Sequence, residues 1–304
     1  MKPQIFTPTV TILKDNGKLD IEGNIRLMNA LIEGGVDGFV PMGSTGEYPF
    51  FKNNQEKKEY LSEYIAAAEG RTQLLVGTGG IGYKETIDLS NYVLDKRVKG
   101  VLVISEFYFN MSQLDFYNYY AFMAEHIERD LYIYNFPART GSSIEADTIV
   151  QLVSRYENIK GLKDSVLDFA HTEEILKKVL PIRPDFEVFS GYDHHFLDNI
   201  RLGGAGGISA LSNMVPKVWS GWVKAARTGD KAGMEAGLKR INELMAFYSL
   251  ESNPQKLIKE VLNREGIKVN TFCHFPYDYL LEGSLEKAME LIADDGNYWA
   301  RELM

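Results

Sequence analysis

The chain has 304 residues, a formal net charge of −9 and one cysteine, Cys273. The acidic balance argues against a nucleic-acid or membrane-surface partner, because both favour a basic face. A lone cysteine excludes an intramolecular disulfide, no apolar run is long enough to cross a bilayer, and residues 1–5 carry no apolar signal segment. We therefore expect a cytoplasmic protein with one large domain, or one domain and an appendage.

Short apolar or β-branched runs alternate with amphipathic segments over residues 1–228. The predicted strands are Gln4–Val10, Val36–Gly43, Gln73–Gly77, Gly100–Ile104, Leu131–Phe136, Ile159–Lys163, Phe186–Ser190 and Gly206–Ala210. The predicted helices are Ile21–Glu33, Asn54–Glu69, Lys84–Asp95, Gln113–Glu128, Glu145–Tyr156, Phe169–Leu180, His194–Leu202 and Pro216–Arg227. Eight strand-then-helix units favour an α/β fold of the closed (β/α)8 TIM barrel type over an open doubly wound sheet.

The strand signal stops after about Thr228. Three further segments have helical patterns: Lys231–Leu250, Pro254–Glu265 and Leu285–Leu303. We therefore predict a catalytic barrel over residues 1–228 and a C-terminal helical domain over residues 229–304.

Polar residues gather where the predicted strands end, and in a barrel these ends form the face that carries active sites. The second strand leads into Gly43-Ser44-Thr45-Gly46-Glu47. Two hydroxyls beside backbone N–H groups freed by glycines suit a small carboxylate. The alternative is a helix N-cap formed by Ser44 or Thr45, with Glu47 in the first turn.

The third strand leads into Gly77-Thr78-Gly79-Gly80-Ile81-Gly82, which matches the dinucleotide-binding pattern G-x-G-x-x-G. The motif lies in the third of eight units and not at the start of an open sheet. A nucleotide-dependent dehydrogenase would also leave the other strand-end residues without a role, so we keep it only as an alternative.

The fourth strand leads into Tyr108 and the fifth carries Tyr134, with Arg139 just beyond it. A phenol beside an amine can carry protons in carbon–carbon bond cleavage, although a strand tyrosine is often only a packing residue. Arg139 is a fixed cation suited to a carboxylate or a phosphate. Its alternative is a solvated or salt-bridged loop residue.

The sixth strand, Ile159-Lys160-Gly161-Leu162-Lys163, ends in a lysine with apolar flanks. Burial favours the neutral amine, which is a nucleophile that forms a Schiff base with a ketone. The alternative is a strand-end lysine whose ammonium reaches water. Tyr134 on the preceding strand supports the catalytic interpretation, because neighbouring barrel strands bring such positions together.

The seventh strand leads into Asp193-His194-His195. Adjacent residues rarely converge on one ion and no third cluster supports them, so we predict no metal site. We expect Asp193 to cap the following helix instead.

These motifs together resemble the dihydrodipicolinate synthase / N-acetylneuraminate lyase superfamily of class I aldolases. The resemblance spans nearly the whole chain. It rests on the ordered set Gly43-Ser44-Thr45-Gly46-Glu47, Tyr134-Asn135-Phe136-Pro137, Gly161-Leu162-Lys163-Asp164 and Ser190-Gly191-Tyr192-Asp193. The resemblance implies a (β/α)8 barrel with a C-terminal helical domain, assembled as a homotetramer (a dimer of dimers) or as a homodimer.

The resemblance also implies roles at matching positions. Lys163 is the lysine that forms an imine with pyruvate or another 2-keto acid, so no separate cofactor and no metal are needed. Tyr134 is the acid/base for the aldol oxygen, and Ser44 and Thr45 hold the pyruvyl carboxylate. Thr45 further links Tyr134 to Tyr108, which in many members comes from a neighbouring subunit.

Two more positions follow from the resemblance: the main chain at Ile208 completes the pyruvate pocket, and Arg139 binds a second carboxylate. Gly77-Thr78-Gly79-Gly80, Phe136 and the Ser-Gly-Tyr-Asp run at 190–193 resemble the 2-keto-3-deoxygluconate aldolases. The expected reaction is therefore cleavage or formation of a 2-keto-3-deoxy sugar acid, with pyruvate and an aldehyde as the small-molecule partners.

Arg139 instead matches the synthases that condense pyruvate with aspartate semialdehyde, which use an arginine there for the semialdehyde carboxylate. The 4-hydroxy-tetrahydrodipicolinate (dihydrodipicolinate) synthase is therefore the main alternative. Three others remain open: a keto-deoxy sugar acid dehydratase, an N-acetylneuraminate lyase, and a non-catalytic pyruvate-binding barrel.

Overall fold

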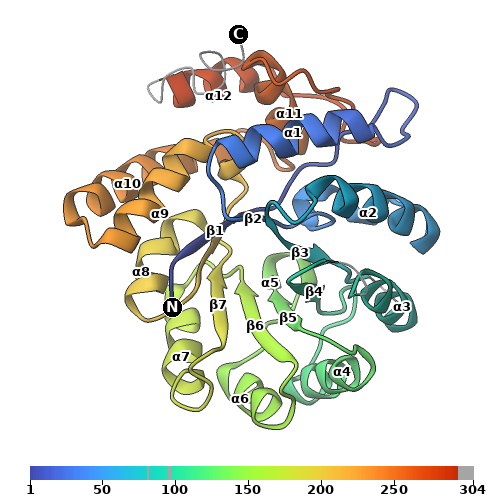
Figure 1. Cartoon of the computed structure of the whole chain (residues 1–304), viewed down its shortest axis with the longest axis vertical. Helices are drawn as coiled ribbons and strands as arrows, with labels where there is room; N and C mark the ends of the chain where they lie inside the picture. Colours follow the sequence, from blue (N-terminus) through green and yellow to red (C-terminus); the bar gives the residue numbers. More distant parts are fainter. Residues whose placement is uncertain (81, 95–96, 294–304) are drawn as a thin grey trace.

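The computed structural model describes residues 1–80, 82–94 and 97–293. Its centre is a closed barrel of eight parallel strands in sequence order, with β8 paired back to β1 (Figure 1). The strands are β1 (Gln4–Thr7), β2 (Gly38–Phe39), β3 (Gln73–Gly77), β4 (Gly100–Ile104), β5 (Leu131–Asn135), β6 (Ile159–Asp164), β7 (Glu187–Ser190) and β8 (Gly206–Ile208). The predicted (β/α)8 barrel is confirmed.

The first two strands fall furthest short of the lengths that their apolar runs predict. β1 ends at Thr7 and β2 at Phe39, and a proline follows each closely, Pro8 and Pro41. Proline has no N–H to donate to a neighbouring strand, so it is seldom found inside a sheet. The remaining apolar residues of both runs stay buried, but they belong to the loops that flank the two strands.

Helices surround the barrel on its outer side (Figure 1). They are α1 (Ile21–Glu33), α2 (Asn54–Ala68), α3 (Tyr83–Leu94), α4 (Gln113–His126), α6 (Ala146–Arg155), α7 (Phe169–Val179), α8 (Phe196–Arg201) and α9 (Pro216–Thr228). The short helical turn α5 (Pro137–Thr140) directly follows β5 and lies inside this ring of helices (Figure 1). The turn α5 was not predicted; it begins at Pro137, whose fixed φ suits the first position of a helix.

Three more helices follow the barrel: α10 (Lys231–Leu244), α11 (Gln255–Arg264) and α12 (Ser284–Ile292). A 3-10 segment at Met245–Ser249 replaces the end of the first predicted helix in this region. The predicted positions Ile81, Asp95 and 294–303 lie outside the described residues. α11 lies beside α1 (Figure 1), and in the segment after α11 the Lys268 carbonyl accepts a hydrogen bond from the Arg26 side chain of α1 at 2.9 Å.

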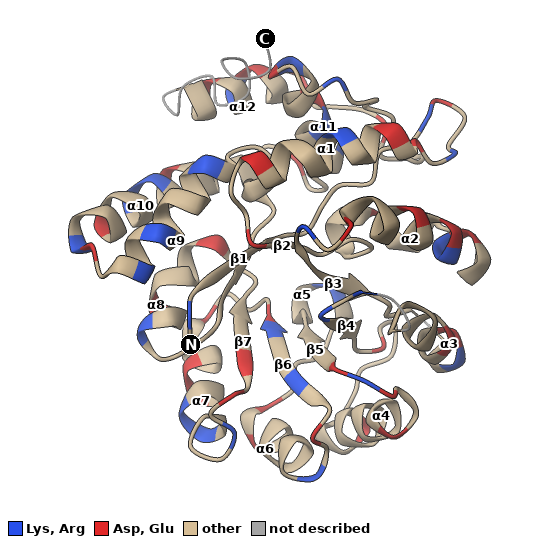
Figure 2. Ribbon diagram, in the orientation of Figure 1, with Lys and Arg blue, Asp and Glu red and all other residues tan. Residues whose placement is uncertain are grey.

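The core has two parts. Phe6, Leu75, Leu102, Phe189 and a few neighbours fill the inside of the barrel, and a larger apolar layer lies between the strands and the helices. Basic and acidic residues are interspersed along the outer helices (Figure 2). None of the helices within the described ranges is both long and apolar enough to cross a membrane.

Candidate active site

Lys163 and Tyr134 lie side by side at the carboxyl ends of β6 and β5. They are register partners in the parallel ladder, so their side chains project to the same side of the sheet. The Lys163 amine donates to the Tyr134 hydroxyl at 3.2 Å and lies 4.3 Å from the centre of its ring. Lys163 is only 7% exposed. The structure therefore brings the two residues together inside the barrel, as expected from neighbouring strands.

Tyr134 is held by aromatic neighbours. It belongs to the apolar cluster inside the barrel, and the Phe136 ring stacks on its ring with the two ring centres 5.8 Å apart. Burial, with a smaller contribution from nearby Tyr134, raises the pKa of Tyr48 to about 12. The phenol that contacts the lysine is that of Tyr134, at 3.2 Å from the Lys163 amine.

The Ser44–Thr45 segment approaches the pair from β2. It forms a 3-10 turn, Ser44–Gly46, whose N-cap residue is Gly43 and makes no side-chain cap bond. The N-cap alternative for Ser44 and Thr45 is therefore wrong. The Ser44 hydroxyl lies 3.5 Å from the Tyr134 hydroxyl. Ser44 in the turn after β2, Tyr134 on β5 and Lys163 on β6 are therefore joined by successive polar contacts. Thr45 is half-buried in the same turn.

Asp193 does not cap the following helix, so that prediction is wrong. The 3-10 helix Asp193–His195 follows Tyr192 as its N-cap residue, and Asp193 is buried within it. Its carboxylate accepts hydrogen bonds from Ser209 and, at 2.8 Å, from Tyr248. Burial raises the pKa of Asp193 to about 6, while these bonds and the nearby charge of Lys163 oppose the rise.

The two histidines after Asp193 are separate from this network. Burial, and then the neighbouring His194, lower the pKa of His195 to about 4. Within residues 1–80, 82–94 and 97–293, no three His, Cys, Asp or Glu side chains are grouped so that they could hold a metal ion. Ile208, the last residue of β8, is buried at the same end of the barrel.

A buried carboxylate next to the lysine escaped the sequence reasoning. Asp164 accepts hydrogen bonds from Asn135 at 2.8 Å and from Thr172 at 2.7 Å, and its other contact is His171 at 2.9 Å. Burial alone lowers the pKa of His171, but the hydrogen bond and charge of Asp164 outweigh it and raise that pKa. The network fixes the ends of β5 and β6 to α7. In the sequence, the only indication of this network was that Asp164 directly follows Lys163 and Asn135 directly follows Tyr134.

Arg139 and Tyr108 lie farther out. Arg139 is exposed on α5, and its charge opposes the rise in the pKa of Tyr192 that burial and Tyr134 cause. It therefore lies at the rim of the site. Tyr108 is 90% exposed and has a positive φ of 84°, so its ring is not packed in this chain's own barrel.

The glycines of the G-x-G-x-x-G pattern have a packing role. A Cβ on Gly77 would lie 2.2 Å from the Met42 carbonyl oxygen, and one on Gly79 would lie 2.6 Å from the Ile104 side chain. Both distances are too short for any larger residue. Close approach of β3 to the chain after β2 and to β4 therefore explains the two glycines without a nucleotide.

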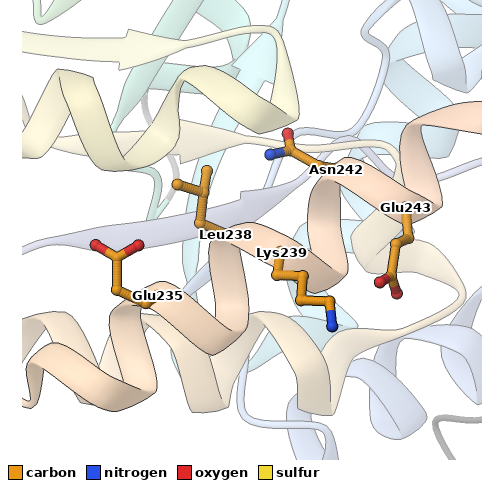
Figure 3. Close-up of a pocket in the computed structure, with 5 residues that line it drawn as sticks. All are labelled: Glu235, Leu238, Lys239, Asn242 and Glu243. Atoms are coloured by element: carbon orange, nitrogen blue, oxygen red, sulfur yellow. The ribbon is translucent and has the colours of Figure 1, made fainter.

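A surface depression of about 520 Å³ lies elsewhere, along α10 (Figure 3). It is lined by Glu235, Leu238, Lys239, Asn242 and Glu243. All five residues come from one helix, and none comes from a strand end, so the depression is separate from Lys163.

The comparisons with known proteins agree with this geometry. A model of the dihydrodipicolinate synthetase family matches residues 2–294. The "Probable 2-dehydro-3-deoxy-D-pentonate aldolase YjhH" of Escherichia coli (strain K12) is 30% identical over 292 residues, 96% of this chain and 97% of the relative. A 4-hydroxy-tetrahydrodipicolinate synthase of Methanococcus maripaludis is 30% identical over 263 residues, 86% of this chain and 88% of the relative.

A second relative from Escherichia coli (strain K12) also matches in structure. The "Putative 2-dehydro-3-deoxy-D-gluconate aldolase YagE" is 33% identical over 267 residues, 88% of each chain. The crystal structure of YagE in complex with pyruvate superposes on this fold with a TM-score of 0.92 at 31% identity, covering 96% of this chain and 98% of YagE. The chain therefore belongs to the dihydrodipicolinate synthetase family.

Proposed function

We propose that this protein is a Schiff-base-forming class I aldolase that cleaves or forms a 2-keto-3-deoxy sugar acid, with pyruvate and an aldehyde as the other reactants. The observation that carries the proposal is the buried Lys163 amine 3.2 Å from the Tyr134 hydroxyl. The names of YjhH and YagE, which both denote aldolases of such acids, support this substrate class.

The reaction begins with attack of the neutral Lys163 amine on the keto carbon, and loss of water gives a protonated imine. The imine nitrogen accepts the electron pair when the C3–C4 bond breaks, so an enamine forms instead of a carbanion. A proton added at C3 of the enamine gives the imine of pyruvate, and hydrolysis of that imine releases pyruvate and restores the lysine. The lysine itself supplies the covalent chemistry, and the proposal needs no further cofactor.

Tyr134 moves the proton that cleavage requires. The C4 hydroxyl of the substrate must lose its proton as it becomes an aldehyde. The Tyr134 oxygen can take that proton after the phenol has given its own proton to the water that leaves as the imine forms. Ser44, 3.5 Å from that phenol, and Thr45 hold the pyruvyl carboxylate. The first N–H groups of a short helical turn have no partner within the turn, so they are available to an anion. The main chain at Ile208 closes the pocket.

The second candidate is 4-hydroxy-tetrahydrodipicolinate synthase, and Arg139 favours it. A rim cation near Tyr192 suits the carboxylate of aspartate semialdehyde. The match to the Methanococcus maripaludis synthase supports the same candidate. A sugar-acid dehydratase, an N-acetylneuraminate lyase and a non-catalytic pyruvate-binding barrel remain as outcomes of the test below.

We further propose that the protein forms a homodimer or a homotetramer in the cytoplasm, with a barrel over residues 1–228 and a helical domain over 229–304. The exposed aromatic pair Tyr108 and Phe109, 90% and 78% exposed, supports a subunit contact there. A contact of this kind would bring Tyr108 toward Thr45 of a partner and complete a proton path to Tyr134.

The proposal is tested by measuring pyruvate release from 2-keto-3-deoxygluconate, 2-keto-3-deoxypentonate and N-acetylneuraminate, beside condensation of pyruvate with aspartate semialdehyde. The proposal expects cleavage of a sugar acid to have the higher kcat/KM. Faster condensation, abolished in Arg139→Leu, would instead establish the synthase. Loss of water without pyruvate release would indicate the dehydratase, and imine formation without any turnover would indicate a binding protein.

A further inference from the structure

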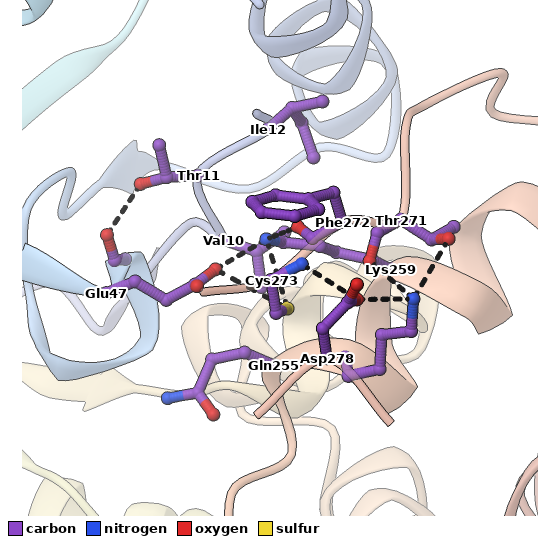
Figure 4. A network of polar contacts seen from close by, with 12 residues as sticks. Val10, Thr11, Ile12, Glu47, Gln255, Lys259, Thr271, Phe272, Cys273 and Asp278 are labelled. Carbon is purple, nitrogen blue, oxygen red and sulfur yellow. Dashed lines mark hydrogen bonds and ion pairs between the residues drawn. The ribbon is translucent and has the colours of Figure 1, made fainter. Parts of the chain in front are cut away.

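The Ser44–Thr45 turn is tied to the C-terminal helices by an ion pair. Glu47 directly follows the turn, adopts a left-handed conformation with φ 58° and is 4% exposed. Its carboxylate lies 2.5 Å from the amine of Lys259, a residue of α11 that is fully buried (Figure 4). The ion pair with Lys259 of α11 therefore holds Glu47, the residue that ends the turn, in place.

Lys259 has no spare hydrogen-bonding capacity. Besides Glu47, its amine donates to the Phe272 carbonyl at 2.8 Å and to the Cys273 sulfur at 3.3 Å (Figure 4). An ammonium group has three donors, and all three are used. Burial raises the pKa of Cys273 to about 11, so the thiol remains neutral beside the ion pair.

Two further hydrogen bonds hold the same turn. Gln255, four residues before Lys259 and hence on the same face of α11, donates to the Ser44 carbonyl at 3.2 Å. From the opposite side of the loop, the Thr11 hydroxyl donates to the Gly46 carbonyl at 2.6 Å. These contacts restrain the turn through its carbonyls and through Glu47, and they leave the Ser44 hydroxyl free to lie beside Tyr134.

We propose that Lys259 is a positioning residue for recognition of the keto-acid carboxylate. By fixing Glu47, it sets the distance between the Ser44–Thr45 turn and the Lys163 amine. A buried ion pair is a weak source of net stability, because desolvation offsets its attraction, whereas it holds one geometry firmly. The inference rests on the proposed function, since it assigns the carboxylate to this turn.

The test compares Lys259→Met with the wild-type protein. The pyruvate adduct on Lys163 is trapped with borohydride across a range of pyruvate concentrations, and the yield is measured by intact-mass spectrometry of the folded fraction. We expect the half-saturating pyruvate concentration to rise about tenfold or more, as for a misplacement of about 1 Å, while the limiting yield is kept. In a turnover assay the same change appears in KM more than in kcat.

Lys99→Met is the matched control. Lys99 forms an ion pair with Glu187 at 2.8 Å near the amino ends of the strands, away from Lys163. It should lower stability without moving the half-saturating concentration. Gln255→Ala is the second test variant, because it removes one tie to Ser44 and leaves the buried charges paired. We expect it to shift half-saturation in the same direction, so the test holds even if Lys259→Met fails to fold.

Unchanged half-saturation in the folded Lys259→Met and Gln255→Ala proteins would overturn the inference and leave the proposed function standing. A rise equal to that in Lys99→Met would also overturn it, since the effect would then be general destabilisation. Absence of any adduct in the wild-type protein would overturn the proposed function together with the inference.

Discussion

Asp193 should make the stability of this protein depend on pH. Burial favours the neutral form of its carboxyl in the folded protein and raises the pKa from 3.8 to about 6. That difference corresponds to about 3 kcal/mol between the two protonation states. Substitution by asparagine keeps the shape and removes the charge.

The sign follows from the two pKa values. Below 3.8 the carboxyl is protonated in both states, and folding carries no penalty from it. As pH rises from 3.8 to about 6 the unfolded chain loses this proton while the folded protein keeps it, so the free energy of unfolding falls, and above about 6 the loss is complete. Over the window from about pH 4.5 to about pH 7.5, the wild-type protein should lose about 2 kcal/mol that Asp193→Asn does not lose.

The assay is urea denaturation at several pH values, followed by the fluorescence of buried Trp219 and Trp222. The quantity of interest is the difference in free energy of unfolding between Asp193→Asn and wild type, because other titrating groups cancel in it. A difference that stays constant across the window would refute the reasoning. It would mean that Ser209 and Tyr248 solvate the carboxylate as well as water does.

Three other predictions can be checked directly by substitution. Tyr134→Phe should lower kcat by about 10²- to 10⁴-fold while Lys163 still forms the imine, as measured by turnover beside borohydride trapping; an unchanged kcat would remove Tyr134 from proton transfer. His171→Asn should lower the free energy of unfolding more near pH 6 than near pH 8.5, as measured by urea titration. The reason is that the raised pKa of His171 stabilises the folded state below 6.5, and this contribution is lost as pH rises. An equal decrease at both pH values would contradict this reasoning. Gly77→Ala should lower the free energy of unfolding by about 1–3 kcal/mol, whereas Gly80→Ala, with 3.9 Å of space, should be tolerated; equal effects would contradict the packing role.

The sequence was enough to predict the features that depend on local pattern. Alternating strand and helix signals identified the barrel. The order of strands around a barrel then placed Lys163 beside Tyr134, because consecutive parallel strands are neighbours. The structure confirms the fold and shows these two side chains in contact.

Features that depend on distant or competing contacts were not predictable. Glu47 and Lys259 are 212 positions apart. Glutamate and lysine are usually surface residues, and nothing near either one in the sequence indicates that the fold buries both. Asp193 directly precedes a predicted helix, which is the position of a helix cap. Its carboxylate instead accepts hydrogen bonds from Ser209 and Tyr248. In both cases the deciding partner comes from another part of the chain.

The central claim is that Lys163 forms a covalent imine with a keto acid. Borohydride reduction in the presence of pyruvate, followed by peptide mass spectrometry, tests it most directly, with Lys163→Ala as the control. We predict one pyruvate-sized adduct, located on Lys163 and absent from the variant. A folded wild-type protein without an adduct, or with one on another lysine, would contradict the proposed mechanism.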